Sequence, residues 1–435
     1  MSKPNAIVAQ SGGPTCVINS SVCGVIQEAK KSKKIGKVLA AHNGILGILK
    51  EELFDVYAEK PASIEALKRT PAAAMGSCRY KLKAIEQNKG DFDRVLDVFK
   101  AHDIRYFFYA GGNDSMDTAD KVNKLAAQCG YELVCIGIPK TIDNDLAFTD
   151  HCPGFGSAAK FVATCAMEAG KDNEALTFDA CAIIEVMGRN AGWIAAAAGL
   201  AAREPQDAPH LIYMPEAAFT FEKLITDVKE VYKEFGRVFI VVSEGLKDEK
   251  GAHIAAETAG FGKDAFGHAT LGGAADVFKN VIEKEAGIKS YWNKLGSQQR
   301  CSMHFASLAD VNEAYMCGKA AVRAAMSGIN GKMITLVRAD STPSTSSGQA
   351  SSPQEKGPKY KCTTGYVELR DAANGEKLVP KEYINQRGNH ITQACRDYIA
   401  PLIKGQAPIT IGKDGLPVYV RLAKRAVEKK LPDYL

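Results

Sequence analysis

The sequence predicts an α/β protein with doubly wound, mostly parallel sheets, and a repeated pattern along the chain supports this prediction. Short apolar runs recur, each is followed by a glycine-bearing loop, and a helical pattern follows each loop. Continuous apolar strands that alternate with helices are typical of parallel sheets covered on both faces. Because 435 residues exceed one small domain, we expect two Rossmann-like lobes and an appended C-terminal segment.

The first expected strand is 6–9, and Ile18, Val22, Val25 and Ile26 after it fall on one helical face. Further strands are expected at 106–110, 133–138, 182–186 and 238–242. Ligands of such sheets bind beyond the carboxyl ends of the strands, so the loops after these runs are the candidate sites.

The later part of the chain changes in composition. The alanine-rich stretch 191–202 is too short to span a membrane and predicts a tightly packed internal helix. Residues 339–358 are rich in Ser, Thr, Gly and Pro, which predicts a flexible surface loop. We expect 359–435 to pack back on the body.

Composition excludes several classes of function. A net charge of +5 with scattered Lys and Arg does not indicate a nucleic-acid surface. No apolar run reaches membrane-spanning length, and the first five residues do not resemble a secretion signal. The twelve cysteines show no CxxC spacing, which favours reduced thiols in a cytoplasmic protein over a zinc site or a disulfide framework.

The run 138–146, sequence IPKTIDNDL, is the most informative feature of the chain. It places Lys140, Asp143 and Asp145 directly after an expected buried strand. Two carboxylates and an ammonium are poor choices for a core, but phosphoryl transfer needs a base, a metal ligand and a cation together. Asp-Asn-Asp is also a common turn composition, although a turn would not require Lys140.

Two glycine loops offer backbone N–H groups to an anion. Gly12 and Gly13 follow the first expected strand and precede a helix, as Gly112 does after 106–110. The residues 113–115 add polar side chains, and helix capping by Asp114 or Ser115 is the alternative explanation.

Other candidates follow later strands or small residues. Arg189 follows Met187 and Gly188 at the end of 182–186, and arginine is the usual partner of phosphate. A salt bridge to a structural carboxylate would also explain Arg189. Further candidates are Glu244 after 238–242 and two arginines beside small residues, Arg79 and Arg300. For each of these two arginines, a solvated position on the surface is the alternative.

In this order, the motifs GGNDS, PKTIDND, MGRNAGW, SEG and QR resemble those of the phosphofructokinase family, from about residue 6 to 337 and more loosely in the tail. The resemblance implies that 1–150 forms a phosphoryl-donor lobe and 151–338 a sugar-phosphate lobe, with the chain crossing between them. It also implies a Mg²⁺ cofactor and a homodimer or homotetramer.

Two positions separate the donor classes in that family. ATP-using members typically have glycine where this chain has Asp114 and Lys140, whereas pyrophosphate-using members resemble this chain at both. Asp114 would stand where the α-phosphate of ATP must lie, and like charges about 4 Å apart repel by about 4 kcal/mol at a dielectric of about 20. Lys140 would supply the cation that a small donor without adenine needs.

The resemblance also assigns roles. Asp143 would be the general base that takes the proton from the C1 hydroxyl of fructose 6-phosphate, with Lys140, Asp114 and Arg189 as the other catalytic residues. The expected donor-binding residues are Gly12, Gly13, Arg79, Gly112 and Ser115, and the expected metal ligands are Asn113 and Asp145. The expected sugar-phosphate residues are Thr141, Ile142, Asp143, Met187, Gly188, Arg189, Glu244, Ser297 and Arg300.

Three residues depart from the pattern of the family. Asn113 replaces an aspartate of many members, so metal binding would use its amide oxygen or water, or fall to Asp145. Ser297 replaces a tyrosine of many pyrophosphate-using members. Ala180 replaces a basic residue of many ATP-using members, so another residue, for example from a neighbouring subunit, would complete the phosphate clamp.

The expected activity is reversible phosphoryl transfer from pyrophosphate to fructose 6-phosphate. Three alternatives remain at this stage: an ATP-dependent enzyme of the same fold, a non-catalytic subunit that senses sugar phosphates, and a kinase acting on a dinucleotide or lipid. The last would leave the MGR, SEG and QR motifs unexplained.

Overall fold

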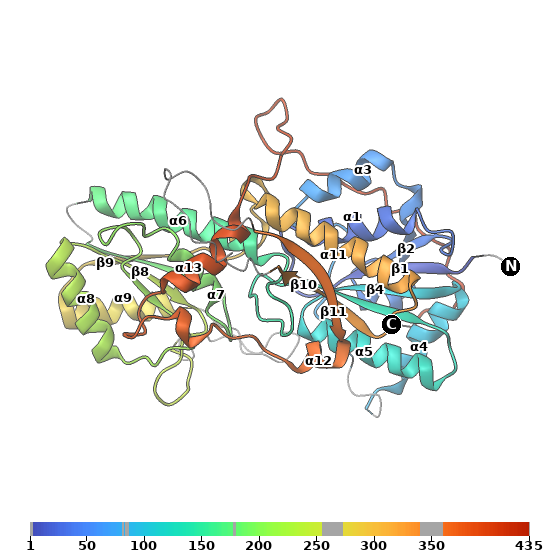
Figure 1. Cartoon of the computed structure of the whole chain (residues 1–435), viewed down its shortest axis with the longest axis horizontal. Coiled ribbons are helices and arrows are strands. Elements are labelled where there is room, and N and C mark those ends of the chain that lie inside the picture. The colour runs from blue at the N-terminus through green and yellow to red at the C-terminus, as the bar shows by residue number, and fades with distance from the viewer. Residues whose placement is uncertain are drawn as a thin grey trace, which may run out of the picture.

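The computed structural model describes residues 3–80, 82, 87–176, 180–254, 273–339 and 360–434. Two β-sheets form two lobes that lie side by side, and the C-terminal segment runs across both (Figure 1). The described strands are β1 (Asn5–Gln10), β2 (Val38–Ala41), β3 (Leu53–Asp55), β4 (Ile104–Gly111), β5 (Val134–Pro139), β6 (Cys181–Val186), β7 (Leu211–Tyr213), β8 (Val238–Ser243), β9 (Ser290–Lys294), β10 (Lys332–Arg338) and β11 (Cys362–Glu368). The described helices are α1 (Ile18–Ala29), α2 (Ile45–Leu49), α3 (Pro61–Ala66), α4 (Lys89–Ala101), α5 (Asn113–Gln128), α6 (Phe155–Ala175), α7 (Trp193–Ala198), α8 (Phe221–Phe235), α9 (Ala274–Ala286), α10 (Gln298–Cys301), α11 (Leu308–Met326), α12 (Leu369–Asn374) and α13 (Gln393–Ile399).

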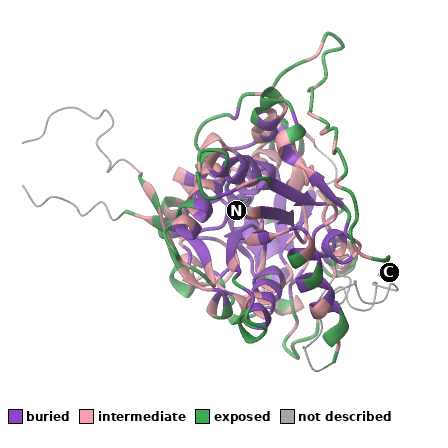
Figure 2. Ribbon diagram, turned by 90° about the vertical axis from the view of Figure 1, so that its right-hand side faces the viewer, coloured by how far each residue is buried: buried purple, intermediate pink, exposed green. Residues whose placement is uncertain are grey.

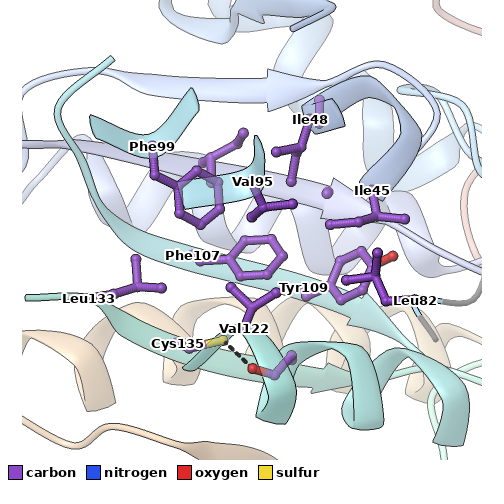
Figure 3. Packing of buried hydrophobic residues seen from close by; sticks show 14 of the residues in the cluster. Ile45, Ile48, Leu82, Val95, Phe99, Phe107, Tyr109, Val122, Leu133 and Cys135 are labelled. Atoms are coloured by element: carbon purple, nitrogen blue, oxygen red, sulfur yellow. Dashed lines mark hydrogen bonds between the residues drawn. The ribbon is translucent and has the colours of Figure 1, made fainter. Parts of the chain in front are cut away.

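The larger sheet has seven strands in the order β11-β10-β5-β4-β1-β2-β3. Its strands are parallel except β3 and β11, which pair antiparallel at the two edges. Side chains alternate across it, so Ile7 and Ala9 pack toward α2, α4, α5 and α12, whereas Ala6 and Val8 pack toward α1, α3 and α11. Figure 3 shows part of the first of these two layers, with Phe107 of β4 between Val95 of α4 and Val122 of α5. The sheet is therefore buried on both faces (Figure 2).

The smaller sheet has four parallel strands in the order β7-β8-β6-β9. Helices α6, α7 and α13 cover one face and α8 and α9 the other. Residues at its ends determine where α8 begins and ends. The Thr220 hydroxyl accepts a hydrogen bond from the Lys223 amide at the start, and Gly236, whose φ is 70°, ends the helix. The prediction of doubly wound, mostly parallel α/β sheets is confirmed.

The chain crosses between the lobes. Strand β10 lies within the segment 151–338 that we expected to form the sugar-phosphate lobe, yet it joins the seven-stranded sheet beside β5. This return of the chain is a crossing of the kind that the expected lobe division includes, and β10 extends the apolar face formed by β5 and α11. The expected flexible loop 339–358 lies, apart from Ala339, outside the described residues.

The C-terminal tail covers one edge of the larger sheet. The Val427 amide donates to the carbonyl oxygen of Leu53, and the Asp55 amide donates to that of Arg425. The buried carboxylate of Glu51 accepts the amides of Lys430 and Leu431. The tail thus occupies backbone groups of β3 that an edge strand would expose. All twelve cysteines are free thiols, and none of the described helices is long and apolar enough to cross a bilayer.

Candidate active site

A cavity of about 550 Å³ opens where the carboxyl ends of strands from both sheets meet. Each of β1, β4, β5, β6 and β8 ends in a loop that reaches its wall, as expected for a doubly wound fold. It is lined by Gly12, Gly13, Pro14, Thr15, Arg79, Gly112, Asn113, Asp114, Ser115, Lys140, Thr141, Ile142, Asp143, Asp145, Met187, Arg189, Asn190, Ala191, Glu244, Arg300 and Glu376.

Two cations meet the glycine loop after β1. The Lys140 ammonium donates to the carbonyl oxygen of Gly13 at 2.8 Å. A Cβ at Gly12, where φ is 74°, would lie 3.1 Å from this ammonium, and one at Gly13 would lie 3.1 Å from Nη1 of Arg300. The glycines therefore let Lys140 and Arg300 approach the backbone, and together with Arg79 they make this end of the cavity suited to anions.

The second glycine loop leads into α5. Gly112 precedes this helix, and Asn113, Asp114 and Ser115 form its first turn. Backbone N–H groups at a helix N-terminus attract anions. The Oδ1 atom of Asn113 is buried and has no hydrogen-bond partner among the described residues. An unsatisfied amide oxygen at the cavity wall fits a hard cation.

The loop after β5 carries the carboxylates. The Asp143 amide donates to the Thr141 hydroxyl at 3.1 Å, which tightens the turn. Burial raises the pKa of the Asp143 carboxyl, and the negative charge of Glu244 raises it further. Burial and then the charge of Asp143 raise the pKa of Asp145. A carboxyl whose pKa is raised toward neutrality can accept a proton near physiological pH.

Burial also lowers the pKa of Lys140, to about 8, although Asp143 and Asp145 oppose this effect. The lysine is 4 % exposed. Protein groups and not water therefore surround the Lys140 ammonium. In this environment its interaction with a bound anion is stronger than in water.

The strands β6 and β8 complete the wall. The Met187 amide donates to Oε1 of the buried Gln299 at 3.1 Å, and Ser243 donates to the carbonyl oxygen of Gly188 at 2.7 Å. Gly188 has a φ of 135°, which turns the chain so that Arg189 reaches the cavity. The Glu244 amide donates to the carbonyl oxygen of Val186, so the two loops are joined.

Arg300 reaches the cavity from a short helix. Its Nε atom is buried and has no hydrogen-bond partner within the described chain. A guanidinium with an unsatisfied donor at a cavity wall suits a bound phosphate.

The structure brings together all but two of the expected site residues. Gly188 does not line the cavity but orients Arg189, as described above. Ser297 also lies outside, since it is exposed and begins the helical turn that carries Arg300, with its carbonyl oxygen accepting the Arg300 amide. A sugar contact by the short Ser297 side chain is therefore not supported.

Sequence reasoning missed five wall residues: Pro14, Thr15, Asn190, Ala191 and Glu376. Pro14 and Thr15 directly follow Gly12 and Gly13, and Asn190 and Ala191 lie within the motif MGRNAGW, so the signal for these four residues was already in the sequence. Glu376 had no such signal because it comes from the C-terminal segment, and it reaches the cavity through an antiparallel bridge to Leu146.

A second cluster of ionisable groups lies outside the cavity. His151 is 1 % exposed, with Nδ1 2.8 Å from Asp150 and Nε2 2.7 Å from Glu313. The potential ligand atoms of His151, Glu313 and Cys362 lie within 4.8 Å of one another. Both ring nitrogens already face carboxylates, so this cluster forms a closed ionic network.

The fold and the cavity define a class of protein, an enzyme that transfers phosphoryl groups on a doubly wound scaffold, with cations, carboxylates and the N-terminus of α5 facing one cavity. The family model for phosphofructokinase matches residues 5–325. The chain belongs to this family.

Several relatives and solved structures that are similar to this chain over its full length are named as pyrophosphate-dependent enzymes. A pyrophosphate–fructose 6-phosphate 1-phosphotransferase of Xanthomonas campestris is 47% identical over 99% of both chains, and one of Halomonas elongata is 45% identical over 100% of both. The crystal structure of a pyrophosphate-dependent phosphofructokinase from Nitrosospira multiformis superposes with a TM-score of 0.87 at 42% identity, covering both chains completely.

Proposed function

We propose that the protein transfers a phosphoryl group reversibly between pyrophosphate and the C1 hydroxyl of fructose 6-phosphate. The observation that carries this proposal is the presence of Asp114 and Lys140 in one cavity with the carboxylate Asp143. Full-length relatives named for this reaction, at 44–47% identity, support it.

In the proposed mechanism, Arg300 binds the 6-phosphate and Glu244 accepts hydrogen bonds from sugar hydroxyls. Asp143 takes the proton of the C1 hydroxyl. The C1 oxygen then bonds to the terminal phosphorus, the bond from that phosphorus to the bridging oxygen breaks, and inorganic phosphate leaves. Lys140 and Arg189 stabilise the charge that develops on the transferred group.

We propose Mg²⁺ as the cofactor, held by Oδ1 of Asn113 and by the Asp145 carboxylate. Its role when bound would be to neutralise the oxygens of pyrophosphate. The buried, unsatisfied amide oxygen of Asn113 supports this placement. We also propose a cytoplasmic homodimer or homotetramer; the free cysteines support a reducing compartment.

Assays of the purified protein with each donor test the function. We expect turnover of fructose 6-phosphate with pyrophosphate, little with ATP, and the reverse reaction with phosphate. Asp143→Asn should lower kcat by roughly 10²- to 10⁴-fold without loss of folding. Turnover with ATP alone would contradict the choice of donor.

These assays should include a second acceptor of the phosphoryl group. A sulfofructose kinase of Alkalicoccus urumqiensis is 31% identical over 87% of this chain and 92% of its own. Fructose 6-phosphate and its sulfonate analogue should be compared directly, and a higher kcat/KM for the sulfonate would reassign the acceptor.

A further inference from the structure

We infer that Lys377 is a positioning residue that holds the catalytic loop 143–146 in its active geometry, an inference that rests on the proposed function. Lys377 belongs to the C-terminal segment, outside the residues 5–325 that match the family model. It does not line the cavity. It therefore acts on the site through the backbone and side chains of the loop.

The loop needs such support because its centre adopts an unfavourable conformation. Asn144 lies between the two cavity-facing aspartates and has a φ of 54°, in the left-handed region, which residues other than glycine rarely adopt and which asparagine tolerates better than most of them. Such a residue persists only where its surroundings fix it. The Asn144 side chain is fully buried and does not line the cavity, whereas Asp143 and Asp145 on either side of it do.

The carboxamide of Asn144 is held at three points. Its Oδ1 atom accepts the Cys152 amide at 2.9 Å and the Lys377 ammonium at 3.2 Å. Its Nδ2 atom donates to the Tyr398 hydroxyl at 3.1 Å. Two of these three contacts come from the C-terminal segment.

The Lys377 ammonium has three N–H donors, and three acceptor oxygens lie within hydrogen-bond distance of it. Besides Asn144 it donates to the carbonyl oxygens of Thr149, at 3.2 Å, and Asp150, at 2.7 Å. It therefore joins Asn144 to Thr149 and Asp150 within the segment between β5 and α6. The Tyr398 hydroxyl donates to the same Asp150 carbonyl oxygen at 2.6 Å.

The backbone of Lys377 is fixed as well. Its amide donates to the carbonyl oxygen of Asp145 at 2.7 Å, and its carbonyl oxygen accepts Nε1 of the buried Trp193 at 2.9 Å. The ammonium lies 5.5 Å from the Trp193 ring centre, a cation–π distance. A lysine anchored at both ends of its side chain can transmit rigidity from the smaller lobe to the loop.

The test compares Lys377→Met, which removes the ammonium but keeps the apolar stem, with Lys381→Met on the exposed surface of the same segment. We expect Lys377→Met to lower kcat by about 10- to 100-fold, since Asp143 moves from the C1 hydroxyl. The KM for fructose 6-phosphate should change by less than about threefold, because the Arg300 clamp is untouched.

Tyr398→Phe is the second variant, in case Lys377→Met folds poorly. It removes one contact to Asn144 and keeps the aromatic packing on Trp193, 5.2 Å between ring centres. Tyr383→Phe, in the same aromatic cluster, is its control. We expect Tyr398→Phe to lower kcat less than Lys377→Met, and the double variant to be non-additive.

Amide hydrogen exchange gives a readout that does not depend on turnover. Exchange of residues 143–152 should accelerate in Lys377→Met and remain unchanged in Lys381→Met. An inactive parent protein would contradict the proposed function while leaving this exchange test decisive. The inference is overturned if exchange is unchanged, or if kcat falls only in proportion to the folded fraction in both Lys377→Met and Tyr398→Phe.

Discussion

The Lys140 ammonium donates a 2.8 Å hydrogen bond to the carbonyl oxygen of Gly13 and so ties the loop after β5 to the glycine loop after β1. The same bond places the cation where both loops line the cavity. The proposed binding of pyrophosphate depends on this cation being charged.

The first prediction concerns pH. Burial lowers the pKa of Lys140 to about 8, so the ammonium that binds the anion is present below this pH and is lost as pH rises through it. We expect kcat/KM for pyrophosphate to fall above pH 8. Lys140→Arg, which keeps its charge, should lack this alkaline decline when kcat/KM is measured over the same range. Identical declines in both proteins would assign the titration to another group.

The second prediction concerns the choice of donor. Replacing Asp114 by Gly removes the charge that would meet the α-phosphate of ATP, so the ratio of kcat/KM for ATP to that for pyrophosphate should rise at least about 10-fold. The limit is about 1,000-fold, since roughly 4 kcal/mol of repulsion is removed. Adding Lys140→Gly to Asp114→Gly should raise the ratio further, because loss of the ammonium weakens the binding of pyrophosphate.

Asp117→Asn is the control for this substitution. Asp117 lies one turn further along α5, outside the cavity lining, and pairs with Lys121 at 2.7 Å. An equal rise in the ATP ratio in Asp117→Asn would show that the net charge of the helix, and not the position of Asp114, decides the donor.

The central strands could be predicted from sequence because both of their faces are buried. Residues 6–9, 106–110 and 238–242 are continuous apolar runs, and each lies within a parallel strand. The edge strand β3, only three residues long, and the polar β9 carry no such signal. Their pairing is decided by neighbours distant in sequence.

The site could be predicted from the sequence where ionisable residues directly follow an apolar strand. Lys140 and Asp143 follow β5 directly, so one local pattern reveals both. Glu376 and Lys377 could not be found in this way, because only the bridge between Leu146 and Glu376 brings them to the loop. The raised pKa of Asp143 could not be predicted from the sequence either, because it arises from burial and from the charge of Glu244, which follows β8 of the other sheet.

The third prediction concerns the metal. The unsatisfied amide oxygen of Asn113 is neutral, and a carboxylate there would bind Mg²⁺ more tightly. We expect Asn113→Asp to lower the Mg²⁺ concentration for half-maximal activity about 3- to 10-fold, and Asn113→Leu to raise it. Asn123→Asp, further along α5 and outside the cavity lining, should leave the Mg²⁺ titration unchanged. An unaltered titration in both Asn113 variants would place the ion elsewhere.

The fourth prediction concerns stability. Burial alone would lower the pKa of His151, but hydrogen bonds and charges from Asp150 and Glu313 outweigh it and raise that pKa above 6.5. Arg338 pairs with Asp150, and the Tyr360 hydroxyl donates to Glu313 at 2.6 Å, so both carboxylates keep their places. The His151 ring therefore links the segment before α6 to α11, and the link is strongest when the imidazole is protonated.

A group whose folded pKa is raised contributes stability below its unfolded pKa, and this contribution disappears as pH rises through the folded pKa. Each unit of the shift is worth about 1.4 kcal/mol. Urea unfolding should therefore show His151→Gln destabilised most below pH 6.5, with the difference from the parent protein shrinking as pH rises. His304→Gln, at an exposed site, should match the parent protein at every pH. A deficit in His151→Gln that stays constant with pH would mean that the ring contributes by packing alone and carries no charge in the folded protein.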